Sequence, residues 1–137
     1  MAYYMLLCYQ QEVDEVEQAR REAELPLMVD LHKSLREAGL LVAVQRLRSV
    51  ESATSVRVRG GEAEIVDGPF AVTKERLAGY YIMDCADLDE ALKQASRLPG
   101  ARYGTIEVRP VLPTEEWVNR AREAGAEVPD EAVEYLG

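Results

Sequence analysis

The segment from Tyr3 to Tyr9 restricts the possible folds of this chain more than any other segment does. It reads Tyr-Tyr-Met-Leu-Leu-Cys-Tyr, so apolar side chains occupy both alternating faces of an extended strand. A half-exposed strand alternates apolar and polar residues, whereas a strand that is covered on both sides does not. We therefore predict that this segment is a central strand of a sheet.

Patterns of helix and strand follow one another along the rest of the chain. Apolar residues at three- and four-residue spacing predict a helix within residues 14–38, in which Pro26 begins the main helix or kinks a longer one. Asp87 opens a second helix, which Pro99-Gly100 ends. Further strands are predicted at residues 40–47, 54–59, 62–66, 79–85 and 105–111, with a hairpin turn at Gly60-Gly61 and a short helical turn at residues 73–77.

The order strand-helix-strand-strand-strand-strand-helix-strand is that of a split β-α-β unit with an elaborated hairpin inserted. We therefore predict an α+β fold with a ferredoxin-like core and an antiparallel sheet. Two helices cover only one face of such a sheet, so the apolar residues of the other face need a second cover. A homodimer would supply it, and a C-terminal tail folded over that face is the competing explanation.

The length of 137 residues suits one compact domain. We expect the domain to span residues 1–112, and residues 113–137 to form a C-terminal helical extension that packs on it with Trp117 as anchor. No apolar run approaches the length of a membrane span, so no membrane association is expected. A signal-peptide pattern is absent after Met1, which favours a cytoplasmic protein.

Charge and composition argue against several classes of function. The net charge of −9 disfavours nucleic-acid binding, because the basic residues are interleaved with more numerous acids. Cys8 and Cys85 lie far apart without CxxC spacing and His32 is the single histidine, so we expect no metal site and no cofactor. Four arginines crowd into a less acidic region and form either the solvent face of two strands or an anion site: Arg46, Arg48, Arg57 and Arg59.

The best candidate site is the run Asp67-Gly68-Pro69-Phe70-Ala71-Val72-Thr73-Lys74-Glu75. Gly68 permits a backbone angle that a side chain would block, Pro69 fixes the exit direction, and Phe70 plugs a core or walls a pocket. The turn either holds Asp67 toward a cleft or caps a strand end with Asp67 bonded to its own backbone. Lys74 is the nearest cation able to pair with Asp67, which would lower the pKa of that carboxyl, or to grip a carboxylate substrate.

Tyrosine is the most abundant aromatic residue, with seven Tyr against one Phe. On central strands such residues pack with the hydroxyl at the rim, or they line a pocket suited to flat small molecules. Because side chains of a strand alternate, only one of Tyr80 and Tyr81 faces a given side.

The candidate site continues into Leu77-Ala78-Gly79-Tyr80-Tyr81-Ile82-Met83-Asp84, and on these residues the chain resembles the YCII-related family, in particular its DGPF-domain branch. The resemblance runs from the first strand to Val111. It implies a dimeric α+β barrel, in a group whose members include isomerases, dehalogenases and cofactor-free oxygenases. It also implies a link to transcription, because DGPF-type genes resemble accessory partners of sigma factors.

Members of the wider family are similar in using a histidine on the first helix together with an aspartate. Counting back from Gly39, the corresponding position here is nearer Met28 than His32, so the resemblance does not carry this pair over. We expect His32 at the edge of the buried helix stripe that Leu31 and Leu35 define.

We therefore predict a YCII-related small-molecule-binding protein, a cofactor-free enzyme of proton-transfer type (isomerase- or dehalogenase-like) with its cleft near Asp67. Asp67 is the predicted catalytic base, and the predicted substrate-binding residues are Lys74, Phe70, Tyr80 and Arg46. The alternative is a non-catalytic ligand-binding or accessory module linked to transcription regulation, and whether the protein is an enzyme stays open between the two.

Overall fold

The computed structural model describes residues 2–136. Its strands are β1 (Ala2–Gln10), β2 (Leu41–Arg46), β3 (Thr54–Arg59), β4 (Glu62–Asp67), β5 (Arg76–Cys85) and β6 (Gly104–Pro110). Its helices are α1 (Glu15–Glu22), α2 (Leu25–Glu37), α3 (Leu88–Arg97), α4 (Gly100–Tyr103) and α5 (Thr114–Glu123), with short 3-10 turns η1 (Val50–Ser52) and η2 (Asp130–Tyr135).

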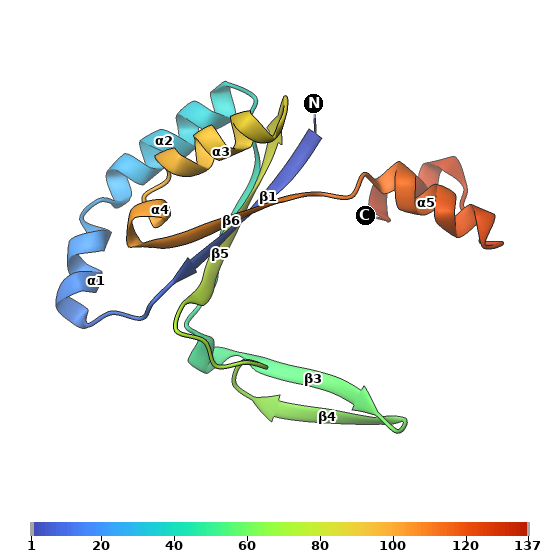
Figure 1. Cartoon of the computed structure of the whole chain (residues 1–137), viewed down its shortest axis with the longest axis horizontal. Coiled ribbons are helices and arrows are strands. Elements are labelled where there is room, and N and C mark those ends of the chain that lie inside the picture. The colour runs from blue at the N-terminus through green and yellow to red at the C-terminus, as the bar shows by residue number, and fades with distance from the viewer. Residues whose placement is uncertain (1, 137) are drawn as a thin grey trace.

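Four strands form one antiparallel sheet in the order β2-β5-β1-β6, and β3 pairs with β4 in a separate hairpin. Helices α2 and α3 cover one face of the four-stranded sheet (Figure 1). The fold is α+β and has the predicted ferredoxin-like arrangement, in which strands from the two halves of a split β-α-β unit interleave. The prediction that Tyr3 to Tyr9 form a central strand is confirmed, because β1 lies between β5 and β6.

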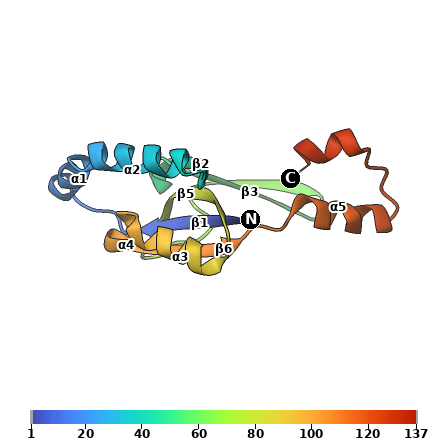
Figure 2. The ribbon, with the colours of Figure 1, turned by 90° about the horizontal axis from the view of Figure 1, so that it is seen from above.

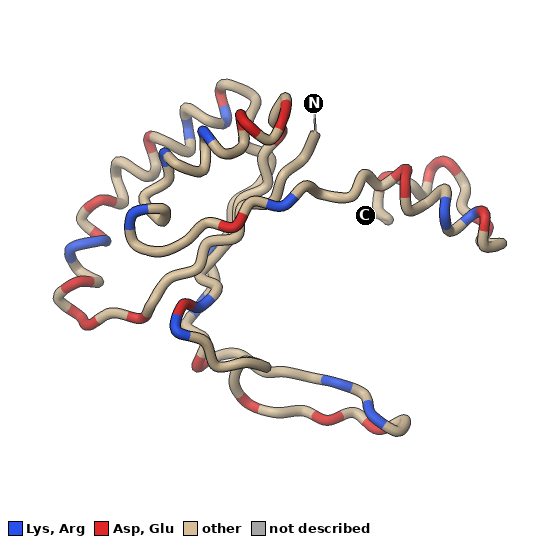
Figure 3. The backbone as a smooth tube through the Cα atoms, viewed as in Figure 1, with Lys and Arg blue, Asp and Glu red and all other residues tan. Residues whose placement is uncertain are grey.

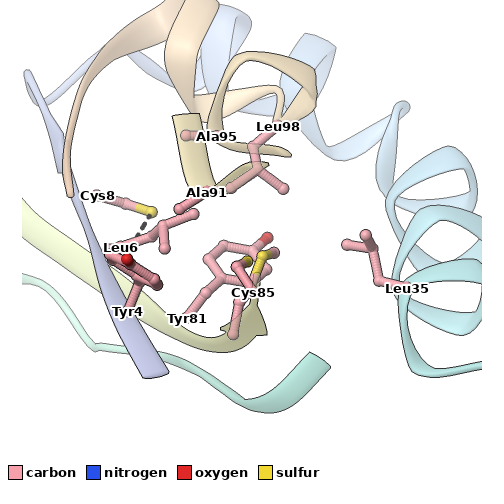
Figure 4. Packing of buried hydrophobic residues seen from close by; sticks show 10 residues of the cluster. Tyr4, Leu6, Cys8, Leu35, Tyr81, Cys85, Ala91, Ala95 and Leu98 are labelled. Carbon is pink, nitrogen blue, oxygen red and sulfur yellow. Dashed lines mark hydrogen bonds between the residues drawn. The ribbon is translucent and has the colours of Figure 1, made fainter. Parts of the chain in front are cut away.

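The hydrophobic core lies between the covered face of the sheet and the two helices (Figure 4). Side chains of β1 and β5 alternate between this face and the open one, as the pleat of a strand requires. From the sheet the core receives Tyr4, Leu6, Cys8, Tyr81, Met83 and Cys85. From the helices it receives Leu35, Ala91, Ala95 and Leu98. Leu35 of α2 is 1% exposed and fixes this helix on the sheet.

The helices begin where local side chains satisfy their first backbone amides. Asp14 Oδ1 accepts a hydrogen bond from the Glu17 amide at 2.8 Å at the start of α1. Pro26 lies in the first turn of α2. Of the two predicted alternatives, a helix start and a kink in a longer helix, the structure shows the helix start. The predicted opening of α3 at Asp87 is confirmed, because Asp87 Oδ1 accepts from the Glu90 amide at 2.9 Å.

The predicted helical turn at residues 73–77 is wrong. Thr73 to Glu75 are irregular, and β5 already begins at Arg76. Arg76 and Leu77 pair with Gln10 and Tyr9 of β1, so the longer central strand keeps this segment extended. For these residues, pairing with a strand that is distant in the sequence outweighs the local propensity for a helical turn.

Two parts of the chain extend beyond the sheet, the β3-β4 hairpin and the C-terminal segment of α5 and η2 (Figures 1 and 2). Helix α5 packs on η2, which buries Val118 and Ala132. In both views α5 extends away from the sheet, and it does not lie over the open face. That residues 113–137 pack on the domain therefore stays a prediction. None of the helices among residues 2–136 has the length and hydropathy to cross a membrane.

Candidate functional site

A cavity of about 490 Å³ lies between α2 and the covered face of the sheet, at the end near α1. Its wall is built from α1, α2, β1, β2, β5 and the turn that follows α3. The outer wall is residues 47–51, which lead from β2 into the β3-β4 hairpin. This volume falls in the range of roughly 300–1,000 Å³ that is typical of small-molecule sites.

His32 and Tyr81 form a hydrogen-bonded pair in the wall of this cavity. His32 Nε2 lies 2.7 Å from Tyr81 Oη, and the two rings meet edge to face with their planes at 75°. Tyr81 is 7% exposed on the covered face of β5. His32 is three residues before Leu35 on α2, so the burial of Leu35 holds the imidazole above the phenol.

The environment keeps both members of this pair neutral at pH 7. Burial lowers the pKa of His32, and the nearby guanidinium of Arg46 lowers it further. Burial raises the pKa of Tyr81 to about 12. The phenol is therefore protonated and the neutral imidazole has one unprotonated ring nitrogen, so one group can accept a proton while the other holds one to give.

Arginine side chains dominate the charge of the cavity wall. Arg21 is bound to Glu17 at 3.1 Å, and Arg76 is bound to Glu12 at 3.3 Å. Arg46 and Arg48, which also line the cavity, take part in none of the ion pairs formed within residues 2–136. Their guanidinium groups are therefore available to an anion in the cavity.

The residues that the sequence nominated fall into three separate places. Arg46 lines the cavity with His32 and Tyr81, and Tyr80 borders it on β5 with its side chain on the opposite face of the strand. Lys74 lines a different, open depression with Tyr9 and Glu107.

Asp67 and Phe70 lie outside both hollows, at the base of the β3-β4 hairpin. Asp67 ends β4 and is exposed, and Phe70 is 95% exposed, so Phe70 plugs no core formed by residues 2–136. The turn itself is well anchored, because the Gly68 amide donates to the Ala53 carbonyl at 2.7 Å and Ser55 Oγ donates to the Gly68 carbonyl at 2.8 Å. Gly68 has φ +97°, which explains the need for glycine. Among residues 2–136, no ion pair joins Asp67 to Lys74.

The sequence reasoning missed the His32–Tyr81 pair, although a signal for it was present. His32 follows Met28 by four residues and precedes Leu35 by three, which places it on the same helix face as the buried stripe. Tyr81 shares its strand parity with Met83 and Cys85, both fully buried. Reading the two patterns together predicts a histidine and a tyrosine directed into the same layer.

Within residues 2–136, no group of three or more His, Cys, Asp and Glu side chains is placed to hold a metal ion. Arg46 and Arg48, which form no ion pair within residues 2–136, give the cavity wall two hydrogen-bond donors that suit an anionic or carbonyl-bearing molecule.

Fold and cavity together define a small ferredoxin-like α+β protein with a ligand-sized cavity beneath its first long helix. The YCII-related domain matches residues 2–115. An uncharacterised protein of Rhizobium meliloti (strain 1021) is 43% identical over 113 residues, which are 79% of this chain and 90% of that relative. The chain therefore belongs to the YCII-related family, as the resemblance predicted.

Proposed function

We propose that this protein binds a small organic carboxylate in the cavity between α2 and the sheet, and that His32 and Tyr81 transfer a proton on it without a cofactor. The observation that carries the proposal is the 2.7 Å contact between His32 Nε2 and Tyr81 Oη in a cavity that also receives Arg46. A base, an acid and an anion-binding group thereby share one wall.

The arginines support the choice of a carboxylate. A guanidinium presents two parallel N–H donors that match the two oxygens of a carboxylate. Arg46 lines the same cavity as His32 and Tyr81, so its guanidinium can hold a ligand against them. Arg48 follows on the same wall and offers a second contact.

The protonation states support proton transfer. A neutral imidazole takes a proton from a substrate carbon or hydroxyl, and the protonated phenol returns one to another position of the same molecule. The ligand then gains and loses one proton, which is the balance of an isomerisation, and the imidazolium returns its proton to the phenolate across the 2.7 Å contact, which restores both side chains. The electrons move within the substrate, so this reaction needs no redox partner.

The sequence nominated Asp67 as the base, with Lys74 and Phe70 as further contacts, and this remains the alternative within the same function. Asp67 belongs to the Asp-Gly-Pro-Phe turn on which we propose that the chain is a member of the DGPF branch. A base at Asp67 requires that its hairpin approach a ligand, because Asp67 does not line the cavity of this chain.

We further propose a homodimer formed through the open face of the sheet. This face carries Tyr3, Met5 and Leu7 of β1, and Tyr3 is 48% exposed. Large apolar side chains on an otherwise uncovered sheet face favour a partner surface.

The test uses the imidazole of the single histidine as a reporter. Small mono- and dicarboxylates are titrated into the isotope-labelled protein while the NMR shifts of His32 are followed. We expect a saturable shift with at least one carboxylate, and a 10- to 100-fold weaker affinity in Arg46→Gln, because a charge-assisted hydrogen bond contributes about 1.5–3 kcal/mol. Arg57→Gln, on the distant hairpin, is the control and should bind as the native protein does.

A bound carboxylate then serves as candidate substrate in a deuterium-exchange assay. We expect His32→Gln to bind it and to lose exchange of its protons with solvent. Exchange that survives in His32→Gln and disappears in Asp67→Asn would assign the base to Asp67. If no carboxylate shifts His32, or if Arg46→Gln binds as tightly as the native chain, the proposal fails.

A further inference from the structure

The β3-β4 hairpin has one apolar face that no other part of residues 2–136 covers. Val56 lies opposite Ile65 in the hairpin register, and Val58 lies opposite Ala63, so these four side chains share a face. Val56 is 66% exposed and Ile65 is 70% exposed. The other face is polar, with Arg57 opposite Glu64 and Arg59 opposite Glu62.

A two-stranded ribbon of this kind is marginally stable in water when it stands alone. Figure 1 shows the hairpin extending from the sheet without a helix or strand packed on it. It extends on the side of the open sheet face, away from α2 and α3, and the C-terminal segment extends on that side as well (Figures 1 and 2). The open face thus lies between two projecting segments.

We infer that the apolar face of the hairpin docks on the open sheet face of a second copy of this chain, and that the second copy returns the same contact. This inference rests on the proposed homodimer and adds to it the element that makes the contact. Each chain carries both halves of such a contact, a projecting apolar ribbon and a flat apolar sheet. A two-fold arrangement lets both halves be satisfied at once.

The exposed apolar area of the hairpin is consistent with a second copy of the chain as the partner. Five apolar side chains of the hairpin and of the loop after it are 60–95% exposed: Val56, Val58, Ile65, Phe70 and Val72. They offer on the order of 500 Å², when about 100 Å² for each aliphatic side chain and about 200 Å² for Phe are scaled by these exposed fractions. A stable interface needs about 800 Å² from each partner, so the hairpin must be joined by another surface. The open sheet face of the same chain provides the remainder.

Charge also allows two copies to meet here, although each chain carries −9. On the hairpin, Arg57 and Arg59 balance Glu62 and Glu64, and Arg57 lies 3.8 Å from Glu64. On the open sheet face, Glu107 is paired with Arg109 at 2.6 Å. Figure 3 shows mostly uncharged residues along the central strands. The two surfaces therefore approach each other without the repulsion that the total charge suggests.

The test compares two neighbours on one strand. Ile65 and Val66 are 70% and 60% exposed and point to opposite faces of the hairpin. Sedimentation equilibrium is measured for the native chain, Ile65→Lys and Val66→Lys, with circular dichroism as a check of folding. We expect a native dimer, an unchanged Val66→Lys dimer and at least a tenfold weaker dimer for Ile65→Lys, and Val56→Lys repeats the test on the other strand.

Each other outcome overturns the inference in a distinct way. A native monomer refutes the proposed homodimer and the docking with it. A native dimer that tolerates Ile65→Lys and Val56→Lys keeps the homodimer and refutes the hairpin contact, as does equal weakening by Val66→Lys. The position of the contact is determined by photo-crosslinking, with Phe70 replaced by photoreactive benzoylphenylalanine. Dimers mixed from isotope-labelled and unlabelled chains distinguish crosslinks between two copies from those within one chain. We expect crosslinks to β1 or β5 of the other copy, and crosslinks confined to one chain would refute the docking.

Discussion

The pair of Tyr81 and His32 leads to the most direct prediction, because β5 offers a matched control one residue away. Tyr81→Phe removes the hydroxyl from the 2.7 Å contact and leaves the ring in place. Tyr80→Phe makes the same chemical change on the opposite face of the strand, where the hydroxyl takes part in none of the side-chain hydrogen bonds found for residues 2–136. Packing is conserved in both variants, so their difference reports the hydrogen bond.

The expected loss of stability depends on the hydrogen bond that each variant removes and on the polar group that is left without a partner. A net intramolecular hydrogen bond contributes about 0.5–1.5 kcal/mol to stability, and a buried partner left unsatisfied adds a further cost. The imidazole is only partly buried, so water replaces some of the lost contact. We expect Tyr81→Phe to lower the free energy of unfolding by about 1–2 kcal/mol and Tm by roughly 3–8 °C. Tyr80→Phe should stay within about 0.5 kcal/mol of the native protein.

Urea denaturation of the native chain, both single variants, His32→Phe and the double variant Tyr81→Phe/His32→Phe gives the coupling free energy of the pair. We expect a coupling of about 1 kcal/mol, as contacting residues in one hydrogen bond show. A coupling near zero, or a Tyr80→Phe variant as unstable as Tyr81→Phe, would refute the assignment of the pair as a structural and chemical unit.

Three further predictions concern the core and its titration. Leu35→Ala should cost about 2–5 kcal/mol in urea denaturation because Leu35 is buried, whereas Leu27→Ala, 70% exposed on the same helix, should cost less than about 0.5. Burial raises the pKa of Tyr81 from 10.0 to about 12, so its contribution to stability is present below pH 10.0 and is lost as the pH rises toward 12; Tyr81→Phe should flatten that decline in thermal melts. Burial raises the pKa of Cys8 to about 11 and that of Cys85 as well, so neither thiol should react with a chromogenic disulfide at pH 8 until the chain unfolds.

The elements that sequence reasoning predicted well depend on short-range chemistry. The two apolar faces of Tyr3 to Tyr9, the side-chain cap of Asp87 and the Gly60-Gly61 turn are each decided within a few residues. Gly60 and Gly61 both adopt positive φ, +59° and +81°, as a tight hairpin turn of this kind requires. Such features survive folding because tertiary contacts reinforce them.

What sequence reasoning missed depends on which distant segments meet. Residues 73–77 have a local preference for a helical turn, yet pairing with Gln10 and Tyr9 draws them into β5. The alternation of Tyr80 and Tyr81 is evident from the sequence, but the side that faces His32 follows only from the packing of α2. Where Asp67 lies relative to a cavity likewise depends on the direction in which the hairpin leaves the sheet.

Residues 47–51 belong at once to the wall of the cavity and to the chain that leads into the hairpin. A ligand that orders this wall and a second copy that holds the hairpin would act on the same short segment. Thermodynamic linkage then requires the two equilibria to be reciprocal, so that any factor by which assembly tightens ligand binding is the factor by which the ligand tightens assembly. The fraction of chains that associate would then depend on the concentration of the ligand.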